Sequence, residues 1–158
     1  MSYQIMRVGL FTVVASLGAC VVDAGGEPVT ATDESALSRG PASWTNTATL
    51  RCLEIGFFGN VHTSGCHGGG PQQWINSPRT FGDQILNQAI NGCLDSNTSG
   101  DAYTLQCNGG AFQQWTVTDM GRFGFEIRNV ATGLCLDSNP SGEAYTLDCN
   151  GGNFQRWL

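Results

Sequence analysis

Two segments of the chain carry the same polar and aromatic side chains at the same offsets. Each copy has a carboxylate, a phenol and an amide: Asp95, Tyr103 and Asn108, then Asp137, Tyr145 and Asn150. A carboxylate accepts hydrogen bonds from two neighbouring hydroxyls, and an amide can both donate and accept. Tyrosine adds an apolar ring with a hydroxyl at its edge. This set suits a ligand with several adjacent hydroxyls, although each aspartate precedes Ser-Asn and could instead shape a turn.

These side chains belong to a unit that occurs three times. Segments 93–115 and 135–157 are nearly identical, segment 52–74 is a weaker copy, and the units begin 41 and 42 residues apart. Each unit contains Gly-Gly and closes on Gln-x-Trp: Gln72 and Trp74, Gln113 and Trp115, Gln155 and Trp157.

The repeat predicts an all-β fold. The chain has 22 glycines and few runs at helical spacing, which indicates short strands joined by tight turns. A propeller needs at least four blades, so three copies of a four-strand unit favour a β-trefoil instead. We expect pseudo-symmetric repeats at about 47–84, 85–126 and 127–158, none of which could bury a core alone.

The cysteines divide in the same way. The chain has seven, and without Cys20 the other six form three pairs with 13 residues between partners: Cys52 and Cys66, Cys93 and Cys107, Cys135 and Cys149. Zinc ligands are usually two to four residues apart, so this spacing favours one disulfide per repeat. Closing a loop of about 15 residues contributes roughly 3 kcal/mol in the chain-entropy model.

The first residues read as an export signal. Arg7 precedes an apolar run over 8–19, which is too short to span a bilayer but fits a signal peptide at 1–19. Leu17-Gly-Ala-Cys20 resembles a bacterial lipobox, so Cys20 is the predicted lipidation site; the alternative is a soluble secreted protein. Residues 20–46 read as a flexible tether before a domain at 47–158. The predicted location is a bacterial cell surface or outer membrane, or the medium.

Charge limits the partners. A net charge of −6 with no lysine gives no electrostatic attraction to nucleic acid or anionic lipid. We therefore expect no nucleic-acid partner, and membrane contact only through a lipid at Cys20.

Gln-x-Trp with an upstream Cys-Leu-Asp resembles the ricin-B-type lectins, also called carbohydrate-binding module family 13. The match covers about residues 47–158, and the fuller Leu-Asp-Ser-Asn…Cys-Asn-Gly-Gly-x-Phe-Gln-x-Trp string resembles mannose-binding bacterial members. The resemblance implies a non-catalytic domain with one shallow sugar pocket per repeat and neither metal nor cofactor. The implied pocket residues are Asp95, Tyr103, Leu105 and Asn108, then Asp137, Tyr145, Leu147 and Asn150.

Other positions have alternative or structural interpretations. Leu105 and Leu147 could equally be core strand residues. The tryptophans of Gln-x-Trp are expected in the core and the glutamines near the pocket floor. Phe112 and Phe154 stand where close relatives tend to carry tyrosine.

The first repeat departs most. Its pocket positions hold Glu54, His62, Ser64 and His67, and Pro71 precedes Gln72. We interpret it as a degenerate site kept for the fold. The alternatives are a polar pocket for another sugar and a divalent-metal site at Glu54, His62 and His67.

The predicted function is therefore glycan binding by two intact pockets, with mannose-type ligands favoured over galactose-type. A structural or protein-binding trefoil with vestigial pockets is the alternative. A hydrolase is disfavoured because glycoside hydrolysis needs a defined carboxylate pair and the repeats leave no room for a catalytic domain.

Overall fold

The structure, a computed structural model, describes residues 39–158; the predicted signal peptide and Cys20 lie outside this part. The strands are β1 (Arg39–Ala42), β2 (Cys52–Ile55), β3 (Val61–Ser64), β4 (Trp74–Arg79), β5 (Gly82–Asn87), β6 (Gly92–Ser96), β7 (Ala102–Gln106), β8 (Trp115–Asp119), β9 (Phe125–Asn129), β10 (Cys135–Ser138) and β11 (Ala144–Leu147). Three-residue 3-10 turns complete the fold: η2 (Phe57–Gly59), η3 (Gly70–Gln72), η4 (Ala111–Gln113), η5 (Gly121–Phe123) and η6 (Asn153–Gln155).

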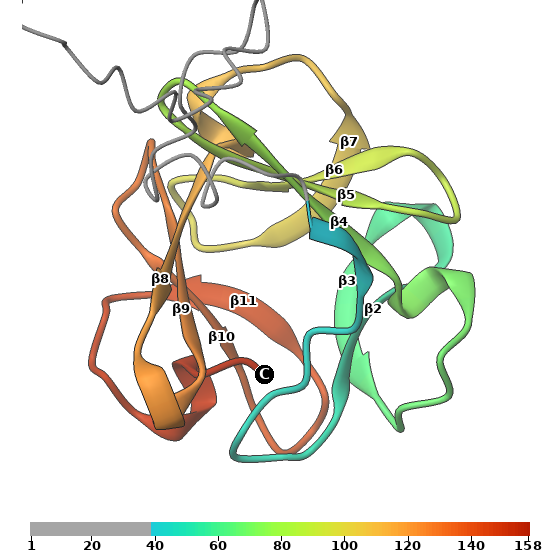
Figure 1. Cartoon of the computed structure of the whole chain (residues 1–158), viewed down its shortest axis with the longest axis vertical. Coiled ribbons are helices and arrows are strands. Elements are labelled where there is room, and N and C mark those ends of the chain that lie inside the picture. The colour runs from blue at the N-terminus through green and yellow to red at the C-terminus, as the bar shows by residue number, and fades with distance from the viewer. Residues whose placement is uncertain (1–38) are drawn as a thin grey trace, which may run out of the picture.

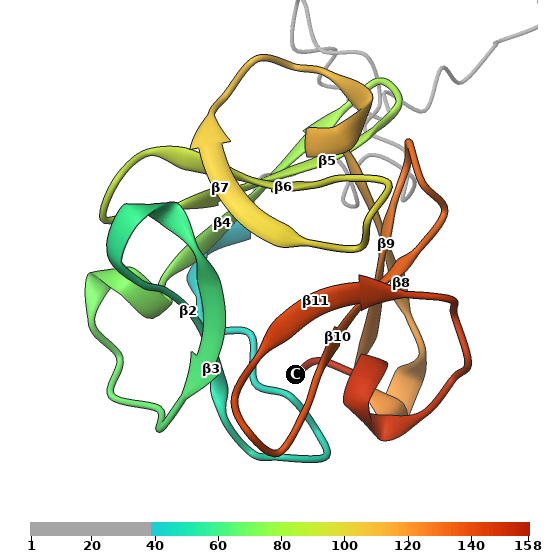
Figure 2. The same ribbon diagram turned by 180° about the vertical axis from the view of Figure 1, so that it is seen from behind.

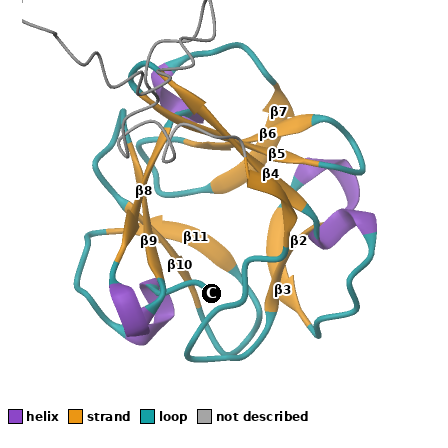
Figure 3. Cartoon of the chain, in the orientation of Figure 1, coloured by secondary structure: helices purple, strands orange, loops and turns teal. Residues whose placement is uncertain are grey.

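Three lobes surround a common axis (Figure 1). Each lobe contributes one short hairpin, β2–β3, β6–β7 or β10–β11, followed by a 3-10 turn that leads into the Gln-x-Trp motif (Figure 3). The hairpins meet at the centre, as Figure 2 shows from behind, through three isolated bridges: Asn60 to Tyr103, Asp101 to Tyr145 and His62 to Glu143. This arrangement is a β-trefoil, which confirms the predicted fold class.

The longer strands form a ring beneath these hairpins. Hairpins β4–β5 and β8–β9 are joined where β5 pairs with β8. The circuit continues from β9 to Trp157 and from Trp157 to Asn46, with reciprocal 2.8 Å backbone bonds between Thr45 and Leu158. β1 closes it by pairing with β4.

This closure corrects the predicted domain boundary. Residues 39–46 were expected in the tether, but β1 lies in the sheet and Trp44 and Asn46 are buried. Trp44 also meets Phe125 edge to face, with 5.6 Å between ring centroids. The domain therefore includes the segment from residue 39. The sequence hid this because β1 is short and polar, and its place depends on pairing with a distant strand.

The core repeats with the sequence. Trp74, Trp115 and Trp157 are fully buried, and each indole N–H donates to a leucine carbonyl of its own repeat. The acceptors are Leu53, Leu94 and Leu136, at 2.9, 2.9 and 3.0 Å. A buried indole needs such an acceptor, so the motif tryptophan both fills the core and fixes the hairpin that carries the leucine.

The disulfide prediction is confirmed. Bonds join Cys52 to Cys66, Cys93 to Cys107 and Cys135 to Cys149, with Cα–Cα distances of 5.0, 5.0 and 5.1 Å. Each ties the first strand of a short hairpin to the loop after the second strand. That loop is the one whose residues reach the candidate pocket.

Candidate functional site

The candidate sites of the second and third repeats are built on matching hairpins. Asp95 lies directly opposite Tyr103 in the β6–β7 register, and Asp137 lies opposite Tyr145 in β10–β11. Directly opposed residues share one face of a hairpin, so carboxylate and phenol lie side by side. Both aspartates are nearly buried, with 4% and 3% of their surface exposed.

Each aspartate is held by two protein donors. One oxygen of Asp95 accepts the backbone N–H of Ser96 at 2.7 Å, and the other accepts Nε2 of Gln113 at 2.9 Å. Asp137 has the same bonds, at the same lengths, from Ser138 and Gln155. A carboxylate has about four acceptor positions, so about two remain for ligand hydroxyls. The turn and the ligand-binding interpretations are therefore compatible.

The glutamines of the Gln-x-Trp motifs connect the buried aspartate of each candidate site to the loop that follows the hairpin. Besides bonding Asp95, Nε2 of Gln113 donates to the Gln106 carbonyl at 3.1 Å, and Oε1 accepts the Asn108 N–H at 2.8 Å. Gln155 does the same with Asp148 and Asn150, at 3.0 and 2.8 Å. Because both glutamines are fully buried, this network fixes the loop relative to the carboxylate.

The amides of the two sites are oriented by their own turns. Oδ1 of Asn108 accepts the Gly110 N–H at 2.7 Å, and Oδ1 of Asn150 accepts the Gly152 N–H at the same distance. Oxygen is thus engaged while the NH2 group stays available as a donor. Both asparagines are exposed, which suits contact with a ligand.

The phenols stay protonated. Burial, and then the charges of Asp95 and Asp101, raise the pKa of Tyr103 above its ordinary value. Burial followed by Asp137 and Glu143 does the same to the pKa of Tyr145. A neutral phenol can donate a hydrogen bond, as Tyr103 does to the Ser96 carbonyl at 3.3 Å. Burial, with the neighbouring carboxylates, therefore keeps both phenol hydroxyls protonated and able to donate.

An exposed apolar shelf borders each site. Leu105 and Leu147 are 51% and 49% exposed, so they are not core residues. Each lies two positions after its tyrosine and therefore on the same strand face. Phe112 and Phe154, also exposed, follow in the 3-10 turns. A carboxylate, a donor amide, a phenol and an apolar shelf together can hold a polyhydroxylated ligand with an apolar face.

Comparison with known proteins agrees with this geometry. Residues 43–157 match the family model described as the ricin-type beta-trefoil lectin domain. The chain belongs to this lectin family. Glycan binding is the general property of the family, and nothing in that match specifies the sugar. A search against curated proteins returned no match.

Solved structures share the fold of this lectin domain. The designed threefold-symmetric protein ThreeFoil has 23% identity and a TM-score of 0.69, over 75% of this chain and 96% of ThreeFoil. The haemolytic lectin CEL-III has 21% sequence identity and a TM-score of 0.68, and the match covers 76% of this chain and 30% of CEL-III. An exo-beta-1,3-galactanase from Clostridium thermocellum has 21% sequence identity and a TM-score of 0.68, and the match covers 75% of this chain and 29% of the galactanase. The chain spans less than a third of the last two, and at these identities the likeness concerns the fold alone.

In the first repeat of the lectin domain the carboxylate is bound differently. Oε2 of Glu54 accepts a short hydrogen bond from Ser64 and one from Nε2 of Gln72 at 2.9 Å, and lies 3.4 Å from Nε2 of His67. Burial raises the pKa of the Glu54 carboxyl, but these bonds and His67 together bring it below its ordinary value. Every one of these contacts falls on Oε2. Oε1 has no protein donor among residues 39–158.

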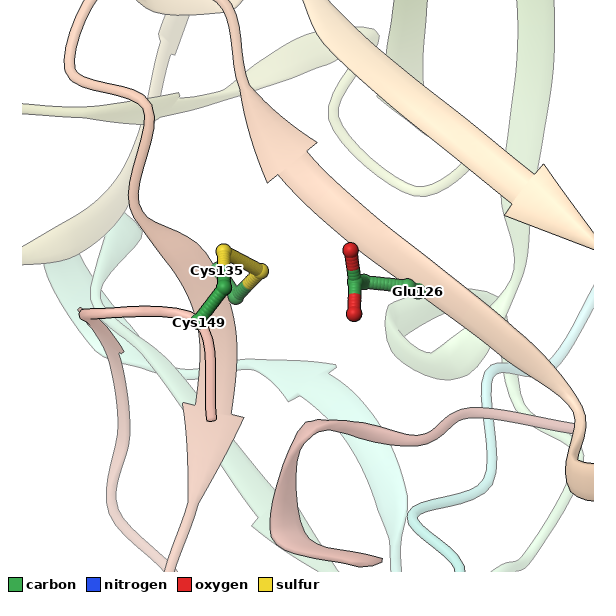
Figure 4. Close-up of side chains that lie close together, drawn as sticks. All are labelled: Glu126, Cys135 and Cys149. Carbon is green, nitrogen blue, oxygen red and sulfur yellow. A yellow bond between two sulfur atoms is a disulfide. The ribbon is translucent and has the colours of Figure 1, made fainter. Parts of the chain in front are cut away.

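The metal alternative receives no support from this arrangement. His67 approaches Glu54, but His62 does not join them in a three-ligand group. Within residues 39–158, the one close group of three potential ligands is Glu126 with Cys135 and Cys149. Figure 4 shows that these two sulfurs form a disulfide, so they offer no thiolate, and Glu126 is paired with Arg156 at 2.6 Å.

The cluster of Glu54, Ser64 and His67 in the first repeat does not have the arrangement of a hydrolytic triad. In a triad the histidine bridges the nucleophile and the acid. Here Glu54 lies between Ser64 and His67 and contacts both. The serine hydroxyl therefore donates directly to the carboxylate, with no histidine between them. Across the described residues, no helix has the length and apolar character needed to cross a bilayer.

Proposed function

We propose that this domain is a non-catalytic lectin with two sugar pockets, in the second and third repeats, and that it binds mannose-type glycans in preference to galactose-type. The supporting observation is the duplicated Asp–Gln–Asn network, whose Asp–Gln and Gln–Asn bonds are 2.9 and 2.8 Å in both repeats. The exposed Leu105 and Asn108, with Leu147 and Asn150, surround it in matching positions.

A purely structural network would not need those exposed side chains. Leu105 is half-exposed and outside the core, and the turn bond of Asn108 uses its amide oxygen and leaves the nitrogen available. Exposed leucines beside a half-buried tyrosine carry a hydration cost that a ligand with an apolar face removes. The preference for mannose rests on the resemblance of the repeat string to mannose-binding bacterial members.

We also propose that the protein is exported through residues 1–19 and anchored by a lipid on Cys20. Detergent-phase partitioning tests this: the wild type should enter the detergent phase and Cys20→Ala should stay in the aqueous phase. Equal partitioning of the two would favour the secreted form.

The deciding experiment is a glycan array with wild type and an Asp95→Asn/Asp137→Asn variant. Losing a charged hydrogen bond costs about 1.5–3 kcal/mol, so mannoside binding at each site should fall roughly 10- to 100-fold. Asp148→Asn is the control, because it removes an exposed carboxylate of the same loop whose side chain takes no part in the network.

The possible results separate two functions. Mannoside binding that exceeds galactoside binding and disappears in the double variant supports the proposal. Binding that survives the double variant contradicts the site assignment. An array blank for the wild type would favour a structural or protein-binding trefoil.

A further inference from the structure

The first repeat has an open groove with several exposed apolar side chains. It lies between the η2 turn and the turn after β5, and its lining includes Glu54, Phe57, Phe58, His62, Pro71 and Ile90. Phe57 is 89% exposed, Phe58 is fully exposed and Ile90 is 51% exposed. Three large apolar side chains thus face water around one groove.

These residues replace smaller ones at the corresponding positions of the repeated unit. By position in the repeat, Phe57 corresponds to Thr98 and Pro140, and Phe58 to Ser99 and Ser141. Ile90 corresponds to Thr49 and Thr132, whose hydroxyls each bond the buried asparagine of their turn at 3.3 Å. Simple loss of a sugar site does not account for apolar side chains gathered at three separate positions on one groove.

The loop that carries the two phenylalanines is held in place. The Gly59 carbonyl accepts the hydroxyl of Thr104 at 2.9 Å, and Gly56 N–H donates to Asn60 at 2.8 Å. Phe58 is in the left-handed region, with φ 62° and ψ 18°, which is uncommon for an aromatic residue. The backbone therefore presents this ring to solvent instead of packing it.

The groove is polar at one end. Oε1 of Glu54 has no protein donor among the described residues, and His62 lies opposite Glu54 in the β2–β3 register. A purely apolar occupant, such as a bilayer interior, would leave this oxygen of the carboxylate without a donor. An occupant with hydroxyl donors at one end and hydrocarbon at the other satisfies both parts.

We propose that the first repeat binds a saccharide joined to an alkyl or acyl chain, with its hydroxyls on Glu54 and His62 and its chain along Phe57, Phe58 and Ile90. This inference rests on the proposed saccharide binding of the domain and assigns a third site of different specificity. The repeat described above as degenerate would then recognise the head of a glycolipid.

Calorimetry with methyl and octyl α-mannoside, below the micelle concentration of the latter, tests the proposal. We expect octyl mannoside to bind wild type at least tenfold more tightly, since burial of about two methylene groups suffices for that factor. Phe57→Thr/Phe58→Ser/Ile90→Thr, which installs the residues found at the corresponding positions 98, 99 and 132, should abolish the difference. Because these residues are exposed, the melting temperature should be unchanged.

Asp95→Asn/Asp137→Asn separates this proposal from the previous one, since it should lose methyl mannoside binding and keep tight octyl mannoside binding. An octyl advantage that survives the triple variant would overturn the inference. So would equal binding of 1-octanol alone, or a wild-type dimer that the triple variant dissociates in sedimentation. A blank array with octyl binding that depends on Phe57 would contradict only the two-pocket function.

Discussion

Single residues connect the core of this protein to its surface. Gln113 is fully buried, yet its amide bonds both the carboxylate of Asp95 and the backbone of Asn108. Two positions later, Trp115 fills the core. The Gln-x-Trp motif therefore links the packed core to the candidate pocket. Substitution of the glutamine should lower both the stability of the fold and the affinity for ligand.

Replacing Gln113 by alanine should lower the free energy of unfolding by about 2–4 kcal/mol, because Asp95 and the backbone of residues 106 and 108 lose buried partners. Gln114→Ala is the matched control. It lies in the same turn and bonds only the Gly109 carbonyl through its side chain, so it should cost under about 1 kcal/mol. Urea unfolding measures both, and equal costs would contradict the assigned role.

Glu54 should make stability depend on pH. Its pKa in the folded protein lies below the ordinary value of 4.5, because its hydrogen bonds outweigh the effect of burial. The stabilisation is therefore complete above about pH 4.5 and is lost as pH falls through the lower folded value. Urea unfolding between pH 7 and 3 should show wild type losing more stability than Glu54→Gln. Parallel curves for the two would contradict this.

Sequence reasoning singled out the candidate pocket residues because they recur within one chain. The same logic could have found Asn46, Asn87 and Asn129, which stand at one offset before the first cysteine of each repeat. These asparagines are buried, and each donates to the backbone of a Gln-x-Trp turn; their acceptors are Phe154, Pro71 and Phe112. Phe57, Phe58 and Ile90 could not be found this way. Their groove exists only where two distant turns meet.

At the scale of elements, each repeat is a short hairpin closed by a disulfide. Hairpins β6–β7 and β10–β11 have ladders of five and four residue pairs, which alone are marginal in water. The disulfide ties each hairpin to the loop that carries the pocket asparagine. Positions of the cysteines predicted this element correctly because hairpin and disulfide are local in sequence.

Removing the second disulfide with Cys93→Ala/Cys107→Ala should lower the free energy of unfolding by about 3 kcal/mol. The variant Cys135→Ala/Cys149→Ala should lose a similar amount, since its bond has the same sequence separation of 14. Urea unfolding under non-reducing conditions measures the two. Each variant should keep mannoside binding at the site that retains its disulfide. Loss of both sites in either variant would mean that the disulfides act globally.

At the scale of the whole molecule, closure of the ring depends on contacts far apart in sequence. Asn46 pairs with Trp157, and β1 pairs with β4. A repeat count predicted the trefoil, but the predicted domain start is too late, because β1 is short and polar and its place depends on pairing with β4. The threefold symmetry could be predicted from the spacing of the repeats. The position of β1, which closes the ring of strands, depends instead on its pairing with β4.

The same symmetry determines how two sites can act together. The candidate sites of the second and third repeats lie in different lobes around the axis (Figure 2), so under the proposed function each would take its own sugar residue. Under the proposed function, one monosaccharide would gain nothing from the second pocket, while a surface dense in mannose would engage both. Linking two binding events raises apparent affinity by about 10²–10⁴ without any new contact.

Asp95→Asn alone should therefore reduce binding to a dense mannose-coated surface by about 10²–10⁴, the gain that two linked sites provide. Titration with methyl mannoside should show two sites becoming one, with an unchanged dissociation constant for the remaining site. Asp137→Asn should give the same pair of results, because the two networks have the same bonds. Surface plasmon resonance and calorimetry make the comparison. A surface affinity that merely halves would show that the two pockets bind independently, and the symmetry would then serve the fold alone.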